Sequence, residues 1–205
     1  MINKHNSLIP IVILLTSLWG IQQIAAQDGP DKLLFKDGTT KIGHVKYHPG
    51  RTKVRFRKHK KGELQFFDFR EDLSRLIKNY GENDETIYEM KPIGKKQLPT
   101  VLKVKVEGYL SLYVKTTHGI GGGTMDGSGA FVMGNGYSIT DGYVQKKGDS
   151  TLTHLSSTGL FGRRLKKSSV AYFRDCPTLV QKIENKVFTK TKLKEIVTYY
   201  NTECQ

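Results

Sequence analysis

The chain has 205 residues, of which 37% are hydrophobic and 25% charged, a composition that is typical of a globular protein and excludes a disordered chain. Its formal net charge of +14 favours an anionic partner, whether nucleic acid, lipopolysaccharide, anionic lipid or acidic glycan. The two cysteines form no Cys-x-x-Cys motif, which argues against a cysteine-based metal or redox site.

Residues 1–26 have the layout of a secretory signal peptide. A polar start containing Lys4 precedes an apolar run over residues 8–19, and we expect cleavage after Ala26. A retained membrane anchor is the alternative, but Pro10 interrupts an apolar run that is shorter than a bilayer span. We therefore expect a protein secreted to the periplasm or cell envelope, with no transmembrane span after signal removal.

Residues 27–98 are expected to form an N-terminal basic β unit. Runs of strand-forming residues, separated by Asp-Gly and Pro-Gly turns, predict four short strands. These strands are residues 33–35, 42–47, 53–57 and 64–69. Within the third, basic and apolar residues alternate, so Val54 and Phe56 should face a core while the cations share the other face. Such short strands with tight turns suggest a meander or half-barrel.

The end of this unit has a different pattern. Residues 71–80 are compatible with one short helix that carries Leu73, Leu76 and Ile77 on one side. Residues 91–99 contain two prolines, a glycine and a Lys-Lys pair, a composition typical of a linker. We therefore expect the boundary to the next unit there.

Residues 99–158 are expected to form a second β unit made of two hairpins. The paired strands would be residues 101–106 with 109–115, and residues 143–145 with 151–155. Between the hairpins the chain is rich in glycine, and residues 118–129 are interpreted as a mobile surface loop, because residues without side chains build no core of their own.

Residues 159–205 are expected to be helical. A first helix over residues 162–173 precedes two amphipathic helices, in which apolar residues recur at i, i+3, i+4 and i+7. The two stripes are Cys176, Leu179, Val180 and Ile183, and Leu193, Ile196, Val197, Tyr200 and Cys204. Asp175 is the expected N-cap of the first of these helices, and Thr189 or Thr191 that of the second.

Folding back of the two helices as a hairpin would bring Cys176, at the start of one, beside Cys204, at the end of the other. A disulfide is therefore expected and should stabilise the fold by about 3–4 kcal/mol. Two unpaired buried thiols are the alternative. The predicted fold class is α+β, with antiparallel β-hairpins forming small sheet or half-barrel units, followed by C-terminal helices with a disulfide-bracketed helical hairpin.

Several short motifs occur in a fixed order along the chain. They are an opening Lys-Asp-Gly, then Val-Glu-Gly-Tyr-Leu-Ser-Leu-Tyr, Gly-Tyr-Val-Gln-Lys, Phe-Arg-Asp-Cys-Pro-Thr-Leu and Tyr-Tyr-Asn-Thr-Glu-Cys. In this the chain resembles a family of uncharacterised secreted proteins of Bacteroidetes-type Gram-negative bacteria. The resemblance implies a periplasmic or outer-envelope location and no known activity, so it assigns no functional residue.

Recognisable catalytic and metal motifs do not fit. His118 and the glycines after it are comparable to an esterase oxyanion loop, but Ser128 lacks the Gly-x-Ser-x-Gly context of a nucleophile, and no phosphate-binding Gly-Lys-Ser/Thr occurs. His44 and His48 would share a strand face with Lys46 between them, a cation that disfavours a metal ion. We expect no catalytic residue, cofactor or metal.

The charged feature that stands out is a basic set in the N-terminal unit. It consists of Lys46, Arg51, Lys53, Arg55, Arg57, Lys58, Lys60 and Lys61. Either this is an ordinary solvated face, or it binds an anionic envelope component such as lipid, lipopolysaccharide or glycan; nucleic acid is the least available partner outside the cytoplasm. The expected function is non-enzymatic binding through this surface. The alternatives are a scaffold subunit that binds another envelope protein, and an enzyme without a recognisable motif.

Overall fold

The computed structural model describes residues 29–81, 84–94, 96–120, 124–125, 127–128, 131–132, 136–158 and 165–205. The expected signal peptide at residues 1–26 lies outside the described residues. The described part of the chain is mostly β, followed by helices, which confirms the α+β class. Among its helices, none is long and apolar enough to cross a membrane.

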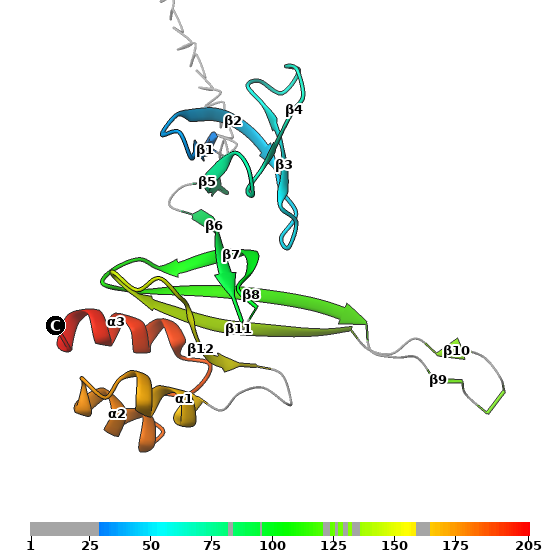
Figure 1. Ribbon diagram of the computed structural model, residues 1–205. Coiled ribbons are helices and arrows are strands. Elements are labelled where there is room, and N and C mark those ends of the chain that lie inside the picture. The colour runs from blue at the N-terminus through cyan, green and yellow to red at the C-terminus, as the bar shows by residue number, and fades with distance from the viewer. Residues whose placement is uncertain are drawn as a thin grey trace, which may run out of the picture.

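The strands are β1 (Asp31–Phe35), β2 (Thr40–Lys46), β3 (Lys53–Arg57), β4 (Gln65–Asp68), β5 (Leu73–Asn79), β6 (Glu85–Ile93), β7 (Leu98–Val106), β8 (Leu110–Ile120), β9 (Thr124–Met125), β10 (Phe131–Val132), β11 (Gly136–Lys146) and β12 (Thr153–Ser157). Ten of them form one antiparallel sheet in the order β12-β11-β8-β7-β6-β5-β1-β2-β3-β4, and β9 pairs with β10 (Figure 1). The helices are α1 (Leu165–Tyr172), α2 (Pro177–Glu184) and α3 (Leu193–Glu203).

The four strands expected at the start of the chain are confirmed as β1 to β4. The predicted alternation in β3 is confirmed, because Val54 and Phe56 are buried while Lys53, Arg55 and Arg57 are exposed. The inward side chains belong to an N-terminal hydrophobic cluster, whose largest members include Phe69, Leu73 and Leu76.

The helix expected over residues 71–80 is wrong: this segment contains β5, which pairs with β1 and β6. A β-bulge explains why the spacing of Leu73 and Leu76 suggested a helix. Leu33 is paired with Leu76 but Phe35 with Leu73, so β5 carries an extra residue at this point. A bulge shifts the inside–outside alternation by one residue, which lets Leu73 and Leu76 both be buried although they are three positions apart.

The linker expected over residues 91–99 is also wrong, since these residues end β6, make a turn and begin β7. Pro92 lies opposite Pro99 in the ladder, so the two residues without a backbone N–H face each other. The sheet therefore continues past the expected boundary, while the buried side chains divide into an N-terminal cluster, a C-terminal cluster and a small cluster between them on β7, β8 and β11.

Both hairpins expected in residues 99–158 are confirmed by the β7–β8 and β11–β12 pairings. The interpretation of residues 118–129 as a loop is wrong for residues 118–120, which extend β8 along β11, and for β9. In Figure 1, β8 and β11 project well beyond their neighbours as a two-stranded arm. Tyr137 is paired with Gly119, and a side chain at residue 119 would collide with the tyrosine ring.

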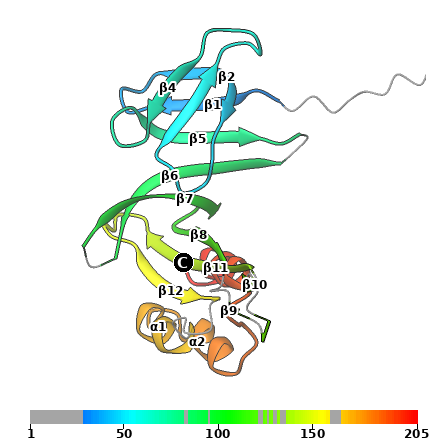
Figure 2. The same cartoon turned by 90° about the vertical axis from the view of Figure 1, so that its right-hand side faces the viewer.

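Three helices cover the C-terminal end of the sheet, with α1 against β12 and α3 against β7 and β8. Figure 2 shows β1 to β5 at one end of the molecule and α1 and α2 at the other. The predicted disulfide joins Cys176 to Cys204, whose Cα atoms are 5.5 Å apart. The predicted caps are wrong, because the residues preceding α2 and α3 are Cys176 and Lys192, and neither makes a side-chain capping hydrogen bond.

Candidate functional site: a basic face and a basic groove

The outward face of β2 and β3 gathers half of the basic set. Lys46 is directly opposite Arg55, and His44 is opposite Arg57. On the other side of β3, Lys53 is paired with Asp68 of β4. We call Lys46, Lys53, Arg55 and Arg57 the outer basic face. All four side chains are exposed, and their fields add because alternation places them on the same side of the sheet.

The other members of the predicted set lie beyond the strands, at opposite ends of β3. Arg51 is in the turn between β2 and β3, whereas Lys58, Lys60 and Lys61 are in the turn between β3 and β4. Arg57 links the face to that second turn, because its Nη1 donates to the backbone oxygen of Lys60 at 3.3 Å. Within the described chain, no ion pair at 4.0 Å or less neutralises any of the eight cations.

Large apolar side chains are exposed on the same side of the sheet. Phe66 of β4 is directly opposite Arg55 and is 60% exposed. Ile42 precedes His44 on the outward side of β2 and is 54% exposed, and Leu64, just before β4, is 38% exposed. Cations interleaved with exposed apolar side chains are an amphipathic surface, which sequence alternation alone did not reveal.

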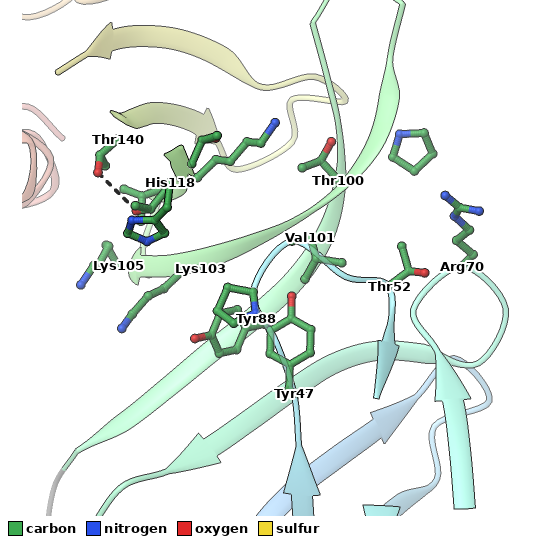
Figure 3. A pocket seen from close by; sticks show the side chains of 17 residues that line it. Tyr47, Thr52, Arg70, Tyr88, Thr100, Val101, Lys103, Lys105, His118 and Thr140 are labelled. Atoms are coloured by element: carbon green, nitrogen blue, oxygen red, sulfur yellow. Dashed lines mark hydrogen bonds between the residues drawn. The ribbon is translucent and has the colours of Figure 1, made fainter. Parts of the chain in front are cut away.

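A groove of about 930 Å³ opens where the β2–β3 turn and the β4–β5 turn meet β7, β8 and β11 (Figure 3). Four cations line it: Arg70, Lys103, Lys105 and Lys115. No aspartate or glutamate is among its described lining residues, and none of the four cations has an ion-pair partner in the described chain. The groove is therefore electropositive.

Lys103 and Lys105 are close neighbours on the groove side of β7. Burial lowers the pKa of Lys103 and the adjacent charge of Lys105 lowers it further, whereas Asp84 acts in the opposite direction. A β-bulge between Val104 and Val106 places the extra residue, Lys105, at the point where β7 bends. Like charges held together without a neutralising carboxylate are stabilised by a bound anion.

The floor of the groove is aromatic and the walls carry hydroxyls. The rings of Tyr47 and Tyr88 pack edge to face with centroids 4.8 Å apart. Burial raises the pKa of Tyr47 to about 12, while the nearby backbone amide of Gly50 acts against the rise. Burial likewise raises the pKa of Tyr88. Both phenols are neutral at physiological pH. Hydroxyls come from Thr52, Thr100, Thr116, Thr117 and Thr140.

Sequence reasoning missed this groove. The side chains that line it come from segments as distant as the β2–β3 turn and β11, so no local motif unites them. One signal was present in the sequence: Lys103 and Lys105 alternate with Leu102 and Val104, the pattern that identified β3. It predicts two cations on one face of a strand, but not what that face meets.

Buried carboxylates elsewhere serve the fold. Asp31 is 5% exposed and accepts hydrogen bonds from the backbone amides of Val45 (2.7 Å) and Asn79 (3.0 Å). Its third partner is the ammonium of Lys78, 2.9 Å away. This network ties β1 to β2 and β5, and it occupies both carboxylate oxygens.

Asp175, the expected helix cap, has a different role. Its Oδ2 accepts hydrogen bonds from Lys146 Nζ and from the Tyr200 hydroxyl, each at 2.6 Å. Burial would raise the pKa of Asp175, but the two hydrogen bonds and the lysine charge outweigh it, so this pKa is lowered. The network joins β11 to the segment before α2 and to α3.

His44 and His48 are not accompanied by a ligand set, since the described residues contain no group of three His, Cys, Asp or Glu side chains arranged to hold a metal ion.

Comparison with protein-family models, with curated proteins and with solved structures finds no match for this chain. The resemblance based on the short motifs therefore stays a prediction, and the outer basic face and the groove are the features from which a function can be inferred.

Proposed function

We propose that the protein is an exported, non-enzymatic binding protein that attaches to an anionic lipid or lipopolysaccharide layer of the cell envelope through its outer basic face. The observation that carries the proposal is the exposed Phe66 opposite Arg55, among cations that form no ion pair at 4.0 Å or less within the described chain. Cations are attracted to anionic headgroups while an exposed ring enters the boundary with the acyl chains.

Two further features support this proposal. The cystine between Cys176 and Cys204 suits an oxidising compartment outside the cytoplasm. The described lining residues of the groove include no aspartate or glutamate, whereas they include four cations, which suits the binding of an anion. The apolar side chains on the basic face favour a lipid layer over a purely polar partner.

The test is co-sedimentation of the mature protein with vesicles made of phosphatidylglycerol and phosphatidylcholine, compared with phosphatidylcholine alone. Replacement of Arg55 and Arg57 by serine should weaken binding by about thirtyfold, since each cation near such a surface contributes about 1 kcal/mol. Phe66→Ser should weaken it by a similar or smaller factor and, unlike the arginine changes, at high salt as well. A control variant is needed to show that the weaker binding is not caused by the lower net charge alone.

The control is Lys167→Ser with Lys190→Ser, which removes the same charge from exposed positions in the helical segment at the other end of the molecule. Circular dichroism should show that all variants fold. If the control loses as much affinity as the arginine variant, or if the arginine variant binds like the wild type, the outer basic face is not the attachment site.

A further inference from the structure

The groove beside the outer basic face has cations at both ends. In Figure 3, Lys103 and Lys105 lie at one end of the groove and Arg70 at the other, with Tyr47 and Val101 between them. A single small anion would reach one end only. Cations separated along a groove match a ligand whose negative groups are separated by uncharged atoms.

The middle of the groove has two kinds of surface. Its floor is formed by the buried Tyr88 and Val101, which are 8% and 7% exposed. Its walls carry threonine hydroxyls, and those of Thr52 and Thr100 already donate to protein oxygens, at 3.1 Å each, which leaves their lone pairs free to accept. An apolar floor between hydroxyl walls suits a ring with a C–H face and an edge of hydroxyl groups.

We propose that this groove is a second binding site, separate from the outer basic face, and that its ligand is a short acidic oligosaccharide. Negatively charged sugar units would pair with Arg70 and with the Lys103–Lys105 pair, while sugar hydroxyls bond to the threonines and a ring face packs on Val101. The volume of about 930 Å³ is at the upper end of the range for small-ligand sites, which suits a ligand of several rings.

Single-stranded nucleic acid fits less well. Its binding depends on bases stacked on open aromatic faces. Here Tyr88 is 8% exposed and Tyr47 already packs edge-on against it, with 62° between the ring planes, so Tyr88 offers no open ring face to a base. Oligosaccharide binding needs no such stacking platform. Burial and the charge of Lys105 lower the pKa of Lys103, and a bound anion of either kind would offset the repulsion from Lys105.

The test measures binding of a size-defined oligogalacturonide by isothermal titration calorimetry at low salt. The probes for comparison are an uncharged malto-oligosaccharide of the same length, an oligothymidylate and inorganic phosphate. We expect the wild-type protein to bind the oligogalacturonide much more tightly than the other three. Lys103→Gln with Lys105→Gln, and Arg70→Gln alone, should each weaken that binding by about tenfold or more.

Controls separate this site from the outer basic face and from misfolding. The Arg55→Ser, Arg57→Ser protein should keep oligogalacturonide binding within about threefold, because neither arginine lines the groove and their attraction acts only at long range. Val101→Thr, which keeps shape but adds a polar group to the floor, should weaken binding without changing charge. Thermal melting of each variant checks the fold.

The proposal is overturned if the wild type does not bind the oligogalacturonide, or if both groove variants bind it as the wild type does. Equal affinity for inorganic phosphate would show a simple anion site, and tighter groove-dependent binding of oligothymidylate would show a nucleic-acid site; both overturn the ligand class. Failure here leaves vesicle binding through Arg55 and Arg57 untouched, because that assay uses different variants and a different probe.

Discussion

Replacement of Asp31 by alanine should be among the most damaging single changes in the N-terminal β unit. It removes the acceptor for the amides of Val45 and Asn79 and leaves the ammonium of Lys78, whose side chain is 17% exposed, without its carboxylate. Loss of one partner of a buried ion pair costs about 3–5 kcal/mol. That is a fifth or more of the stability of a typical domain, which is about 5–15 kcal/mol.

Urea unfolding followed by far-ultraviolet circular dichroism measures this loss, and hydrogen exchange at the Val45 amide localises it. Asp31→Asn should fall between the wild type and the alanine variant, because an amide oxygen can still accept while the charge is absent. Asp149→Ala is the matched control, since Asp149 is exposed and its carboxylate makes no hydrogen bond within the described chain; it should change stability by less than about 0.5 kcal/mol. If Asp31→Ala comes within about 1 kcal/mol of that control, the buried network does not hold the unit together as argued.

Replacement of both Cys176 and Cys204 by serine should lower the free energy of unfolding by about 3–4 kcal/mol, and reductant should then have no further effect. Gly142→Ala should destabilise the protein by about 1–3 kcal/mol in urea, because crowding of a packed interior is unfavourable and the new methyl would lie 2.2 Å from a leucine methyl group of α3. The stability of the wild type should fall as the pH drops below 3.8, because the pKa of Asp175 is lowered on folding by Lys146 and Tyr200 and its contribution is lost as the carboxylate protonates.

The predictions for Gly142 and for Asp175 each have a matched comparison within the chain. Gly136→Ala lies on the same strand, where the nearest atom to a new methyl would be 3.8 Å away, so it should be near neutral; equal effects at the two glycines would contradict the packing argument. Asp175→Asn should be less stable than the wild type at neutral pH and should converge with it at low pH. A constant difference between them across the acid range would mean that the carboxylate charge is not what stabilises this network.

The local pattern of apolar residues was sufficient to predict those strands and helices that bury one face along their whole length. In β3, the alternation around Val54 and Phe56 settles which side faces the core, because strand geometry turns successive side chains to opposite faces. The helical stripes of α2 and α3 work in the same way, and their hairpin brings Cys176 to Cys204. In these elements, the period at which apolar residues recur in the sequence is enough to predict which side chains are buried.

Two kinds of feature were decided by the tertiary structure alone. In one, the inside–outside alternation of a strand is interrupted; in the other, segments that are distant in the sequence meet. The bulge in β5 buries both Leu73 and Leu76, so a strand carries helix-like spacing, and pairing with β1 and β6 overrides that local pattern. Arg70 and the Lys103–Lys105 pair line one groove only because a turn from one β unit closes over β7 of the other. Local periodicity specifies which face of an element is apolar, whereas which faces meet depends on the packing of the whole chain, and the candidate groove is a product of that packing.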